Sequence, residues 1–164
     1  DEVKAGFVTM VAANYLKPKE SPDAWVVEVV NTMKTGDCDK LEKLLTSFFA
    51  SIPYSQRRKD DEREKERYFQ YTFYLVIRMI SSFTVLIEKE QSEGRVDCII
   101  ETPMFVYIFE FKRDGSATEA LKQIEEKGYA REYATDNRTI YLIGCNFSSK
   151  TGTIDDWKSK GESV

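Results

Sequence analysis

Two neighbouring runs of this sequence carry acidic and basic residues at spacings that could support metal-dependent chemistry. The first run contains Asp97, and the second, FVYIFEFK, contains Glu110 and Lys112. Side chains alternate between the two faces of a β-strand, so Glu110 and Lys112 are predicted to point to the same side. The rest of the second run is apolar, and buried charges are costly unless they are paired or bound to a cation. The pair therefore predicts either a structural salt bridge or a catalytic site.

The turn between the two runs decides whether Asp97 joins this pair. A short turn centred on Pro103-Met104 would place Asp97 directly opposite Glu110, with their Cβ atoms about 5 Å apart. Two carboxylates that close repel each other by roughly 4 kcal/mol, which Lys112 and a divalent cation would offset. A shift of one residue would move Asp97 to the other face of the sheet. The alternative is that Asp97 caps the turn or pairs with Arg95.

Composition restricts the chemistry that these residues could perform. The 164 residues include no histidine, which excludes histidine-based catalysis and most zinc sites. The three cysteines lack metal-ligand spacing and are predicted to be reduced core thiols. A metal would therefore be held by oxygen ligands, which favours Mg²⁺ or Mn²⁺. No run approaches the ~20 apolar residues of a membrane span and no signal peptide is visible, so a cytoplasmic domain is expected.

The remaining sequence predicts the elements that position these residues. Helices are expected at about 22–34 and from Asp37 to Ile52. A third is expected from the end of a polar loop at 55–65 to about residue 81, and because it is apolar on nearly every side it should be buried between layers. Strands are expected at 83–90, 95–102, 105–113 and 139–147, a further helix at 116–135, and an irregular tail over the last dozen residues. The order α-β-β-β-α-β implies an α/β fold with a mixed sheet and helices on both faces.

This ordered combination of residues resembles the PD-(D/E)XK nuclease superfamily, in which an Asp, a spacer and Glu-x-Lys lie on a β-hairpin. More narrowly, it is similar to the C-terminal nuclease domain of bacterial AAA-ATPase-like proteins, over nearly the whole chain. The stretches that carry the resemblance are Gly36-Asp37, Phe49–Tyr54, Glu66–Phe69, Glu88, Gly94–Asp97, Glu110–Lys112, Ala120–Ile124, Gly128–Ala130 and Ile143–Phe147.

The resemblance implies an organisation and a function. It implies a helical connecting region at 1–54, a restriction-endonuclease-like core at 55–150 and a polar tail at 151–164, with an ATPase domain preceding them in the parent protein. The implied activity is Mg²⁺- or Mn²⁺-dependent, endonuclease-like hydrolysis of nucleic acid, with DNA favoured over RNA. The alternative is a weakly active or inactive nuclease fold used for binding nucleic acid or protein beside the ATPase. The net charge of −4 supports this alternative, because non-specific DNA affinity comes mainly from cations. Oligomeric state and cleavage specificity stay open.

The resemblance also implies roles for the central residues. Asp97 and Glu110, with the backbone carbonyl of Phe111, would hold one or two metal ions. Lys112 would orient the attacking water or neutralise developing charge. Gln123, on the following helix, would position that water or the lysine.

A further acidic residue is expected to complete the metal site, and it is either Glu66 or Glu88. The alternative for Glu66 is a solvated helix residue, and for Gln123 an exposed polar residue. Tyr129 and Tyr133 are expected to be a packing pair. A final candidate, the phosphate-loop-like segment 144–151, is rejected because Ser149 replaces the required second glycine.

Overall fold

The computed structural model describes residues 22–51, 72–78, 83–92 and 94–162 of the chain. These residues belong to two compact units, one formed by residues 1–82 with 150–153 and the other by residues 83–149 with 154–164. Among the residues that the structure describes, no helix is long and apolar enough to cross a membrane.

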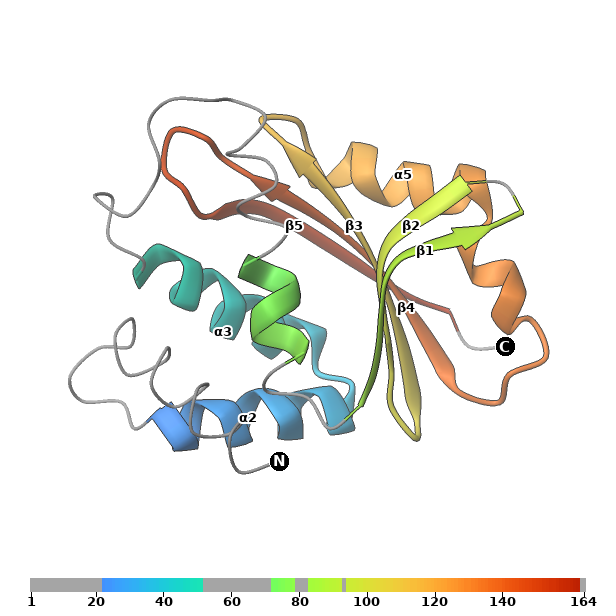
Figure 1. Cartoon of the computed structure of the whole chain (residues 1–164), viewed down its shortest axis with the longest axis horizontal. Coiled ribbons are helices and arrows are strands. Elements are labelled where there is room, and N and C mark those ends of the chain that lie inside the picture. The colour runs from blue at the N-terminus through green and yellow to red at the C-terminus, as the bar shows by residue number, and fades with distance from the viewer. Residues whose placement is uncertain (1–21, 52–71, 79–82, 93, 163–164) are drawn as a thin grey trace. The chain divides into compact units, whose positions relative to one another are not determined.

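The first unit contains the helices α2 (Pro22–Thr35) and α3 (Cys38–Ser51), which confirm the first two predicted helices (Figure 1). Gly36 follows α2 with a positive φ of 76°, a conformation that glycine adopts without steric cost. The side chain of Asp37 accepts a hydrogen bond from the backbone N–H of Lys40 at 2.9 Å, as an N-cap does. Leu41, Leu45, Phe48 and Phe49, which recur at helical spacing along α3, are buried.

The third predicted helix is described only at residues 72–78, which are helical. Phe73, Val76 and Ile77 are buried, whereas Leu75 is 49% exposed. The prediction of an apolar surface buried on nearly every side is therefore wrong at Leu75. Positions i, i+3 and i+4 share one stripe of a helix, and Leu75 lies off that stripe. The predicted polar loop at 55–65 and the last residues of this helix lie outside the described residues.

The second unit is built on a five-stranded sheet with the order β1-β2-β3-β4-β5 (Figure 1). The strands are β1 (Thr84–Gln91), β2 (Gly94–Glu101), β3 (Phe105–Arg113), β4 (Thr139–Phe147) and β5 (Ile154–Glu162). Neighbouring strands are antiparallel except for β3 and β4, which are parallel. Parallel strands need a crossover connection, and here it contains the helix α5 (Ala117–Lys127) and the 3₁₀ helix η2 (Tyr129–Tyr133). The predicted α/β fold with a mixed sheet is confirmed.

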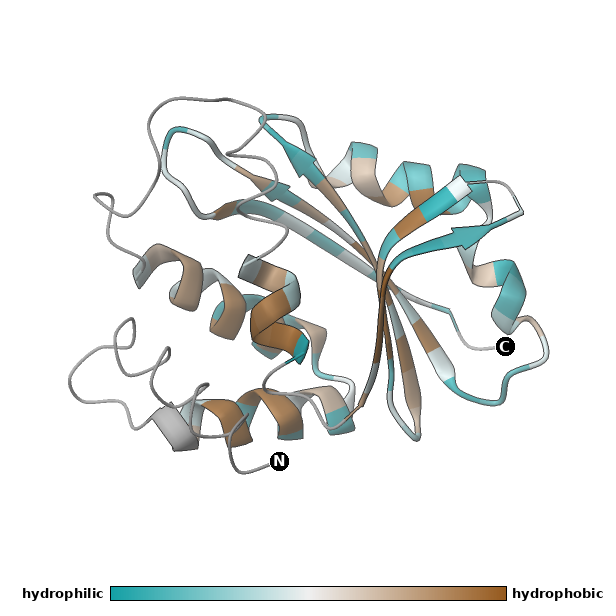
Figure 2. Ribbon diagram, viewed as in Figure 1, coloured by the Kyte–Doolittle hydropathy of each residue, from teal (hydrophilic) through white to brown (hydrophobic). Residues whose placement is uncertain are grey.

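The expected irregular tail is wrong, because β5 pairs with β4 from Ile140 to Phe147. The segment is mostly hydrophilic (Figure 2), which argues locally against a strand. An edge strand, however, needs only one partner and tolerates charged side chains such as Lys158 and Lys160. Backbone hydrogen bonding to β4 therefore stabilises the strand despite the weak strand propensity of this segment.

The predicted helix at 116–135 is also too long. α5 stops at Gly128, which adopts the left-handed conformation with φ 61° and closes the helix through its own N–H. The chain then continues as η2, whose two tyrosines, Tyr129 and Tyr133, are buried. The sequence favoured a continuous helix because apolar periodicity persists beyond this glycine, whereas the left-handed cap redirects the chain.

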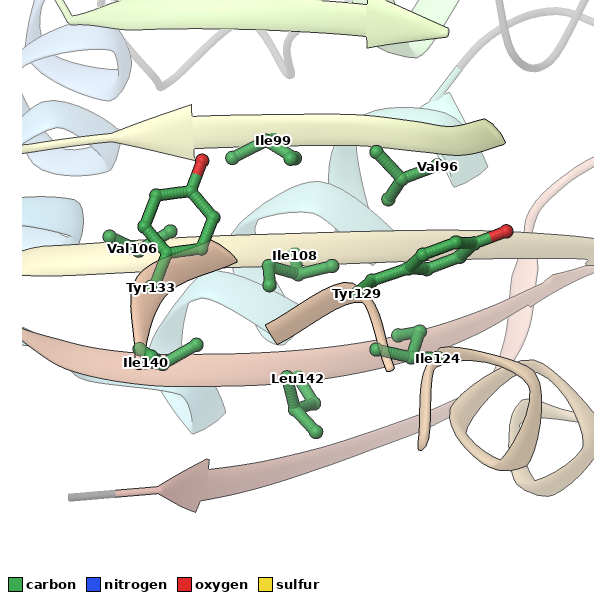
Figure 3. Packing of buried hydrophobic residues seen from close by; sticks show 9 residues of the cluster. All are labelled: Val96, Ile99, Val106, Ile108, Ile124, Tyr129, Tyr133, Ile140 and Leu142. Carbon is green, nitrogen blue, oxygen red and sulfur yellow. The ribbon is translucent and has the colours of Figure 1, made fainter. Parts of the chain in front are cut away.

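The core of the second unit lies between the sheet and its crossover (Figure 3). It consists of buried side chains from β2, β3, β4, α5 and η2, namely Val96, Ile99, Val106, Ile108, Ile124, Tyr129, Tyr133, Ile140 and Leu142. Val106 and Ile108 belong to this core, so the alternation of side chains along β3 places Glu110 on the same face. All three cysteines of the chain are buried thiols, as predicted.

A single glycine permits the close packing of α5 on β4. A Cβ atom added to Gly144 would lie 2.2 Å from the carbonyl oxygen of Ala117 and 2.7 Å from the nitrogen of Leu121. Both are backbone atoms and cannot rotate away. We therefore expect Gly144→Ala to lower the free energy of unfolding by about 1–3 kcal/mol or more in urea denaturation, as overpacked sites do.

Gly161→Ala on β5 is the matched control. Its added Cβ would meet only the Tyr141 side chain, at 3.1 Å. It should cost less than about 1 kcal/mol, as surface substitutions do. Equal stability of the two variants would contradict the close helix–strand contact at Gly144.

Candidate functional site

The β2–β3 hairpin has the register that the sequence predicted. Cys98 lies opposite Phe109, and the pairing continues to Glu101 opposite Val106. Extended by one residue, this register places Asp97 opposite Glu110. Thr102 defines the turn, because its backbone N–H donates to the Phe105 carbonyl at 2.8 Å and its hydroxyl accepts from the Phe105 N–H at 2.9 Å.

The Asp97 carboxylate is oriented by the neighbouring strand. Its Oδ2 atom accepts a hydrogen bond from the backbone N–H of Phe111 at 2.9 Å. Phe111 follows Glu110 directly, so this bond holds the Asp97 carboxylate beside the start of the Glu-x-Lys segment. One oxygen of Asp97 is thereby used in positioning.

Gln123 on α5 connects the other two charged residues. The Lys112 ammonium donates to the Gln123 Oε1 atom, and the Gln123 Nε2 atom donates to Glu110 Oε1. Lys112 Nζ also lies 3.9 Å from Glu110 Oε1. Lysine can only donate and a carboxylate can only accept, so the orientation of the Gln123 amide follows from its two partners. The four residues Asp97, Glu110, Lys112 and Gln123 are therefore brought together.

The position of Gln123 depends on how α5 is held at its N-terminus. Ser116 and Glu119 form a capping box, in which each side chain accepts from the other residue's backbone N–H. Asp156 on β5 accepts a further hydrogen bond from the Ala117 N–H at 2.8 Å. Ile124 buries the adjacent helix face in the core. The unpredicted strand β5 thus helps to place the helix that carries Gln123.

Burial makes the two carboxylates unusually basic. Glu110 is only 3% exposed, and burial followed by the charge of Asp97 raises its pKa to about 8, although Lys112 opposes this shift. Burial also raises the pKa of Asp97, against the hydrogen bond from Phe111 and the charge of Lys112. Two anions in a poorly hydrated site favour retention of a proton or the binding of a cation.

The two other predicted acidic residues differ in what the structure describes. Glu66 lies outside the described residues. Glu88 lies on β1 between the pairs Ile87–Cys98 and Lys89–Val96, which is the position across from Asp97. Its charge raises the pKa of Asp97, but its side chain is 53% exposed and lies 3.8 Å from Arg95. Glu88 therefore lies at the exposed margin of the cluster, across from Asp97.

Glu88 has a backbone conformation that is uncommon within a strand. Its φ is 49°, in the left-handed region that residues other than glycine rarely adopt. Such conformations carry a cost of order 1–3 kcal/mol and are often found at functional sites.

Tyr129 is the residue near the site that the sequence reasoning assigned only to packing. It is 1% exposed and belongs to the core, but its hydroxyl also donates to the Arg95 carbonyl at 2.8 Å. Burial and the charge of Glu110 raise the pKa of this hydroxyl, whereas a hydrogen bond from Gln123 lowers it. The signal that could have found it is Gly128, which ends α5 and turns the next residue back toward the sheet.

Comparison with known proteins identifies the family to which this arrangement belongs. The family model of the PD-(D/E)XK nuclease superfamily matches residues 64–157, more than half of the chain. This chain belongs to the PD-(D/E)XK nuclease superfamily. The match includes Asp97, Glu110, Lys112 and Gln123, and the mixed sheet with its helical crossover agrees with a restriction-endonuclease-like fold.

A protein from Azotobacter chroococcum mcd 1, described as an uncharacterized protein in the vnfD 5′ region, is 31% identical over 155 residues. The alignment covers 93% of this chain but only 30% of that relative. This chain is thus similar to a part of a considerably longer protein.

Members of this superfamily generally use Mg²⁺, and the donor atoms here fit such an ion. Within the described ranges, no group of three or more acidic or cysteine side chains forms a metal centre. Mg²⁺, however, keeps several waters and is commonly held by only one or two carboxylates. Among the described residues, Glu110 Oε2 is buried and has no hydrogen-bond partner. A cation shared with Asp97 would supply that partner, and the Phe111 carbonyl stays a predicted ligand.

The metal response of Asp97→Asn tests this fit. In chelator at pH 9, above the pKa of about 8 of Glu110, we expect the variant to be as stable as the parent or slightly more stable, because it removes one of two repelling charges and its amide oxygen can still accept from Phe111. Mg²⁺ at ten times its dissociation constant should stabilise the parent by about 1.4 kcal/mol and the variant much less. Denaturation curves with chelator and with Mg²⁺ measure both effects. A destabilised variant and two metal-insensitive curves would instead indicate a structural ion cluster.

Proposed function

We propose that this domain is a metal-dependent endonuclease that hydrolyses phosphodiester bonds in DNA. The observation that carries the proposal is the unpartnered, buried oxygen of Glu110 beside Asp97, with Lys112 held next to it through Gln123. Superfamily membership supports the reaction class and favours nucleic acid as the substrate. In a bacterium, this substrate would place the protein in the cytoplasm.

The contacts of each residue in the cluster support a role for it. Asp97 and Glu110 would hold Mg²⁺ or Mn²⁺, which when bound lowers the pKa of water and stabilises charge on phosphate. Lys112 is 30% exposed at its side chain, so its ammonium can reach a substrate while it stays bonded to Gln123. As a compact cation, it would stabilise the negative charge that develops on the phosphate or orient the attacking water.

Gln123 would keep Lys112 and Glu110 in fixed relative positions. It is anchored on α5, whose neighbouring residue Ile124 is fully buried. Preorganised groups stabilise a transition state without reorganisation during the reaction. Glu88, across from Asp97, or Glu66, would bind the hydration shell of the metal.

We further propose that an ATPase domain accompanies this domain in the parent protein, as the narrower resemblance implies. The chain covers only 30% of its relative, which leaves ample length for further domains. The net charge of −4 supports this arrangement, because an acidic domain gains little non-specific affinity for DNA phosphates by itself. We therefore expect the domain alone to bind DNA weakly and with a strong dependence on salt.

A cleavage assay tests the proposed function directly. Supercoiled plasmid, linear duplex DNA and single-stranded RNA would be incubated with the protein in Mg²⁺, Mn²⁺ or chelator. We expect nicked and linear plasmid in the presence of metal only, and plasmid cleavage by Lys112→Ala that is slower by about 10²-fold or more. Lys122→Ala is the matched control, because Lys122 lies one residue before Gln123 on α5 and its side chain is 69% exposed.

Other outcomes of this assay would change the assignment. If the protein cleaves RNA and not DNA, the proposed substrate would be RNA. Failure to cleave any substrate, together with DNA binding that is unchanged in Lys112→Ala, would indicate a nuclease fold used only as a binding module.

A further inference from the structure

We propose that Asn146 is a positioning residue of the candidate site, which anchors the backbone of Gly115 and thereby keeps Lys112 in contact with Gln123. This inference rests on the proposed nuclease function and adds to it a residue on β4, outside the acidic and basic cluster. Asn146 would act through Lys112 and Gln123 rather than on the substrate.

Asn146 lies beside Lys112 in the sheet. The parallel pairing of β3 and β4 places the two residues opposite each other. Gly144, two residues earlier on β4, meets the backbone of α5. The alternation of side chains along a strand therefore directs Asn146 to the face of the sheet that carries α5. Its side chain is only 3% exposed, and a buried amide is costly unless it is hydrogen-bonded.

The amide of Asn146 is hydrogen-bonded at both ends. Its Oδ1 atom accepts from the backbone N–H of Gly115 at 2.9 Å, and its Nδ2 atom donates to Asp155 Oδ1 at 2.8 Å. A backbone N–H can only donate and a carboxylate can only accept, so these two partners select one orientation of the amide. Asn146 therefore connects the loop before α5 with the strand β5.

A β-bulge in β5 supplies the carboxylate that holds Asn146. Asn146 pairs with Asp156, whereas the next residue of β4, Phe147, pairs with Ile154, so Asp155 is an additional residue in β5. Adjacent side chains of a regular strand point to opposite faces, but a bulge redirects them. Here Asp155 bonds to Asn146 while its neighbour Asp156 bonds to the backbone N–H of Ala117, the first residue of α5. The bulge therefore directs two consecutive carboxylates to the start of α5.

Gly115 transmits this anchoring to the lysine. It lies in the segment 114–116 between β3 and α5 (Figure 1), and the next residue, Ser116, is the N-cap of α5. A Cβ atom added to Gly115 would lie 3.4 Å from the Cβ atom of Lys112 and 3.8 Å from Asn146 Oδ1. The Gly115 backbone thus packs against both side chains. A displaced Gly115 would move the base of Lys112 and also the start of the helix that carries Gln123.

The contact that depends on this anchor is the hydrogen bond from Lys112 to Gln123. Its two residues lie on different elements, the end of β3 and the middle of α5, and the chain between them passes through Gly115. Misplacement of a catalytic group by about 1 Å can lower a rate by about 10²-fold. Loss of the anchor should therefore affect the rate of cleavage more than the binding of DNA.

Variants at Asn146 and Asp155 test the proposal. Asn146→Ala removes both hydrogen bonds of the amide. Asp155→Ala removes only the bond that holds the amide, whereas Asp155→Asn keeps an acceptor oxygen for it. Asp155 is exposed, so its variants should fold even if Asn146→Ala does not. Tyr133→Phe is the control for the loss of a hydrogen bond by a buried side chain, because Tyr133 is 5% exposed and donates to Glu101 at 3.0 Å.

Kinetics of DNA cleavage at saturating Mg²⁺ measure the effect. Asn146→Ala should lower kcat about 10-fold or more at unchanged KM. Asp155→Ala should lower kcat about 3-fold, as the loss of one ordinary hydrogen bond does, whereas Asp155→Asn and Tyr133→Phe should retain the parental kcat. A parental kcat in Asn146→Ala, a change in KM alone, or equal kcat values in Asp155→Ala and Asp155→Asn would overturn the proposal.

A double-mutant cycle tests whether Asp155 acts through Asn146. In an Asn146→Ala background, Asp155→Ala should cause no further loss of kcat, because the amide that it holds is missing. Additive losses of kcat would contradict this route.

The side-chain amide signal of Gln123 in an NMR spectrum provides a measurement that does not require cleavage. This amide is bonded to Lys112 and Glu110, so its signal should shift in Asn146→Ala and Asp155→Ala but not in Asp155→Asn or Tyr133→Phe. An unchanged signal in Asn146→Ala would overturn the proposal. A parent protein that cleaves no DNA, although its variants show these shifts, would refute the proposed function and support the positioning role, so the two failures are distinguishable.

Discussion

Lys112→Ala is expected to lower the rate of DNA cleavage by about 10²–10³-fold while metal binding is retained at alkaline pH. The ammonium group is not a metal ligand, and in the structure it contacts Gln123 and Glu110 rather than replacing either carboxylate. Asp97→Ala should lose both cleavage and metal binding, because it removes a ligand. Isothermal titration with Mg²⁺ or Mn²⁺ and the plasmid assay measure the two properties separately.

The pH of this measurement matters. The pKa of Glu110 is about 8 in the parent, although the charge of Lys112 lowers it. Removal of the lysine should therefore raise the pKa of Glu110 further. Metal binding requires the ionised carboxylate. The comparison should therefore be made above this pH as well as at neutrality, and the affinity lost by Lys112→Ala at pH 7 should be largely recovered at pH 9 or above. Parental cleavage by Lys112→Ala would refute the mechanism.

Glu110→Gln is expected to increase the stability of the metal-free protein at alkaline pH. The pKa of Glu110 is raised from 4.5 to about 8 on folding, so between these values the folded state holds a proton that the unfolded chain releases. The stabilisation from this proton is fully present below pH 4.5 and is lost as pH rises through about 8. The loss approaches about 1.4 kcal/mol per pH unit within this window. The variant has no such titration.

Urea denaturation of both proteins in chelator, from pH 5 to pH 9, measures this difference. The parent and Glu110→Gln should have similar stabilities near pH 5 and diverge as pH rises, with the variant more stable at pH 9. Mg²⁺ should reverse the order at high pH, because only the parent binds it tightly. Glu126→Gln, at an α5 side chain that is 64% exposed, is the control and should follow the parent. If the stabilities of parent and variant change with pH in the same way, burial does not raise the pKa of Glu110.

The sequence by itself determined the local arrangement of the candidate site. Alternation along FVYIFEFK places Glu110 and Lys112 on one face, and the turn at Thr102 places Asp97 opposite Glu110. These features depend on residues within one hairpin, where strand periodicity and turn length set the register. Superfamily membership follows from the same local motif and its ordered surroundings.

Tertiary structure decided which distant residues complete the cluster. The contacts of Gln123 with Lys112 and Glu110 depend on α5 lying against β4, which requires the missing side chain at Gly144. Tyr129 reaches the Arg95 carbonyl on β2 because Gly128 ends α5 in a left-handed conformation. A helix that continued to residue 135, as the apolar periodicity predicts, would have left Tyr129 as a packing residue.

The raised pKa values and the strand β5 have the same origin. The charge state of Glu110 follows from its burial, and β5 exists because β4 offers unpaired backbone groups to a polar segment. Neither the charge state of Glu110 nor the strand conformation of β5 follows from the local sequence. The sequence therefore determined which chemical groups are present and how those within one hairpin are oriented. Only the packing of a helix and an edge strand on the sheet decided which of these groups meet, because burial and contact depend on residues far apart in the chain.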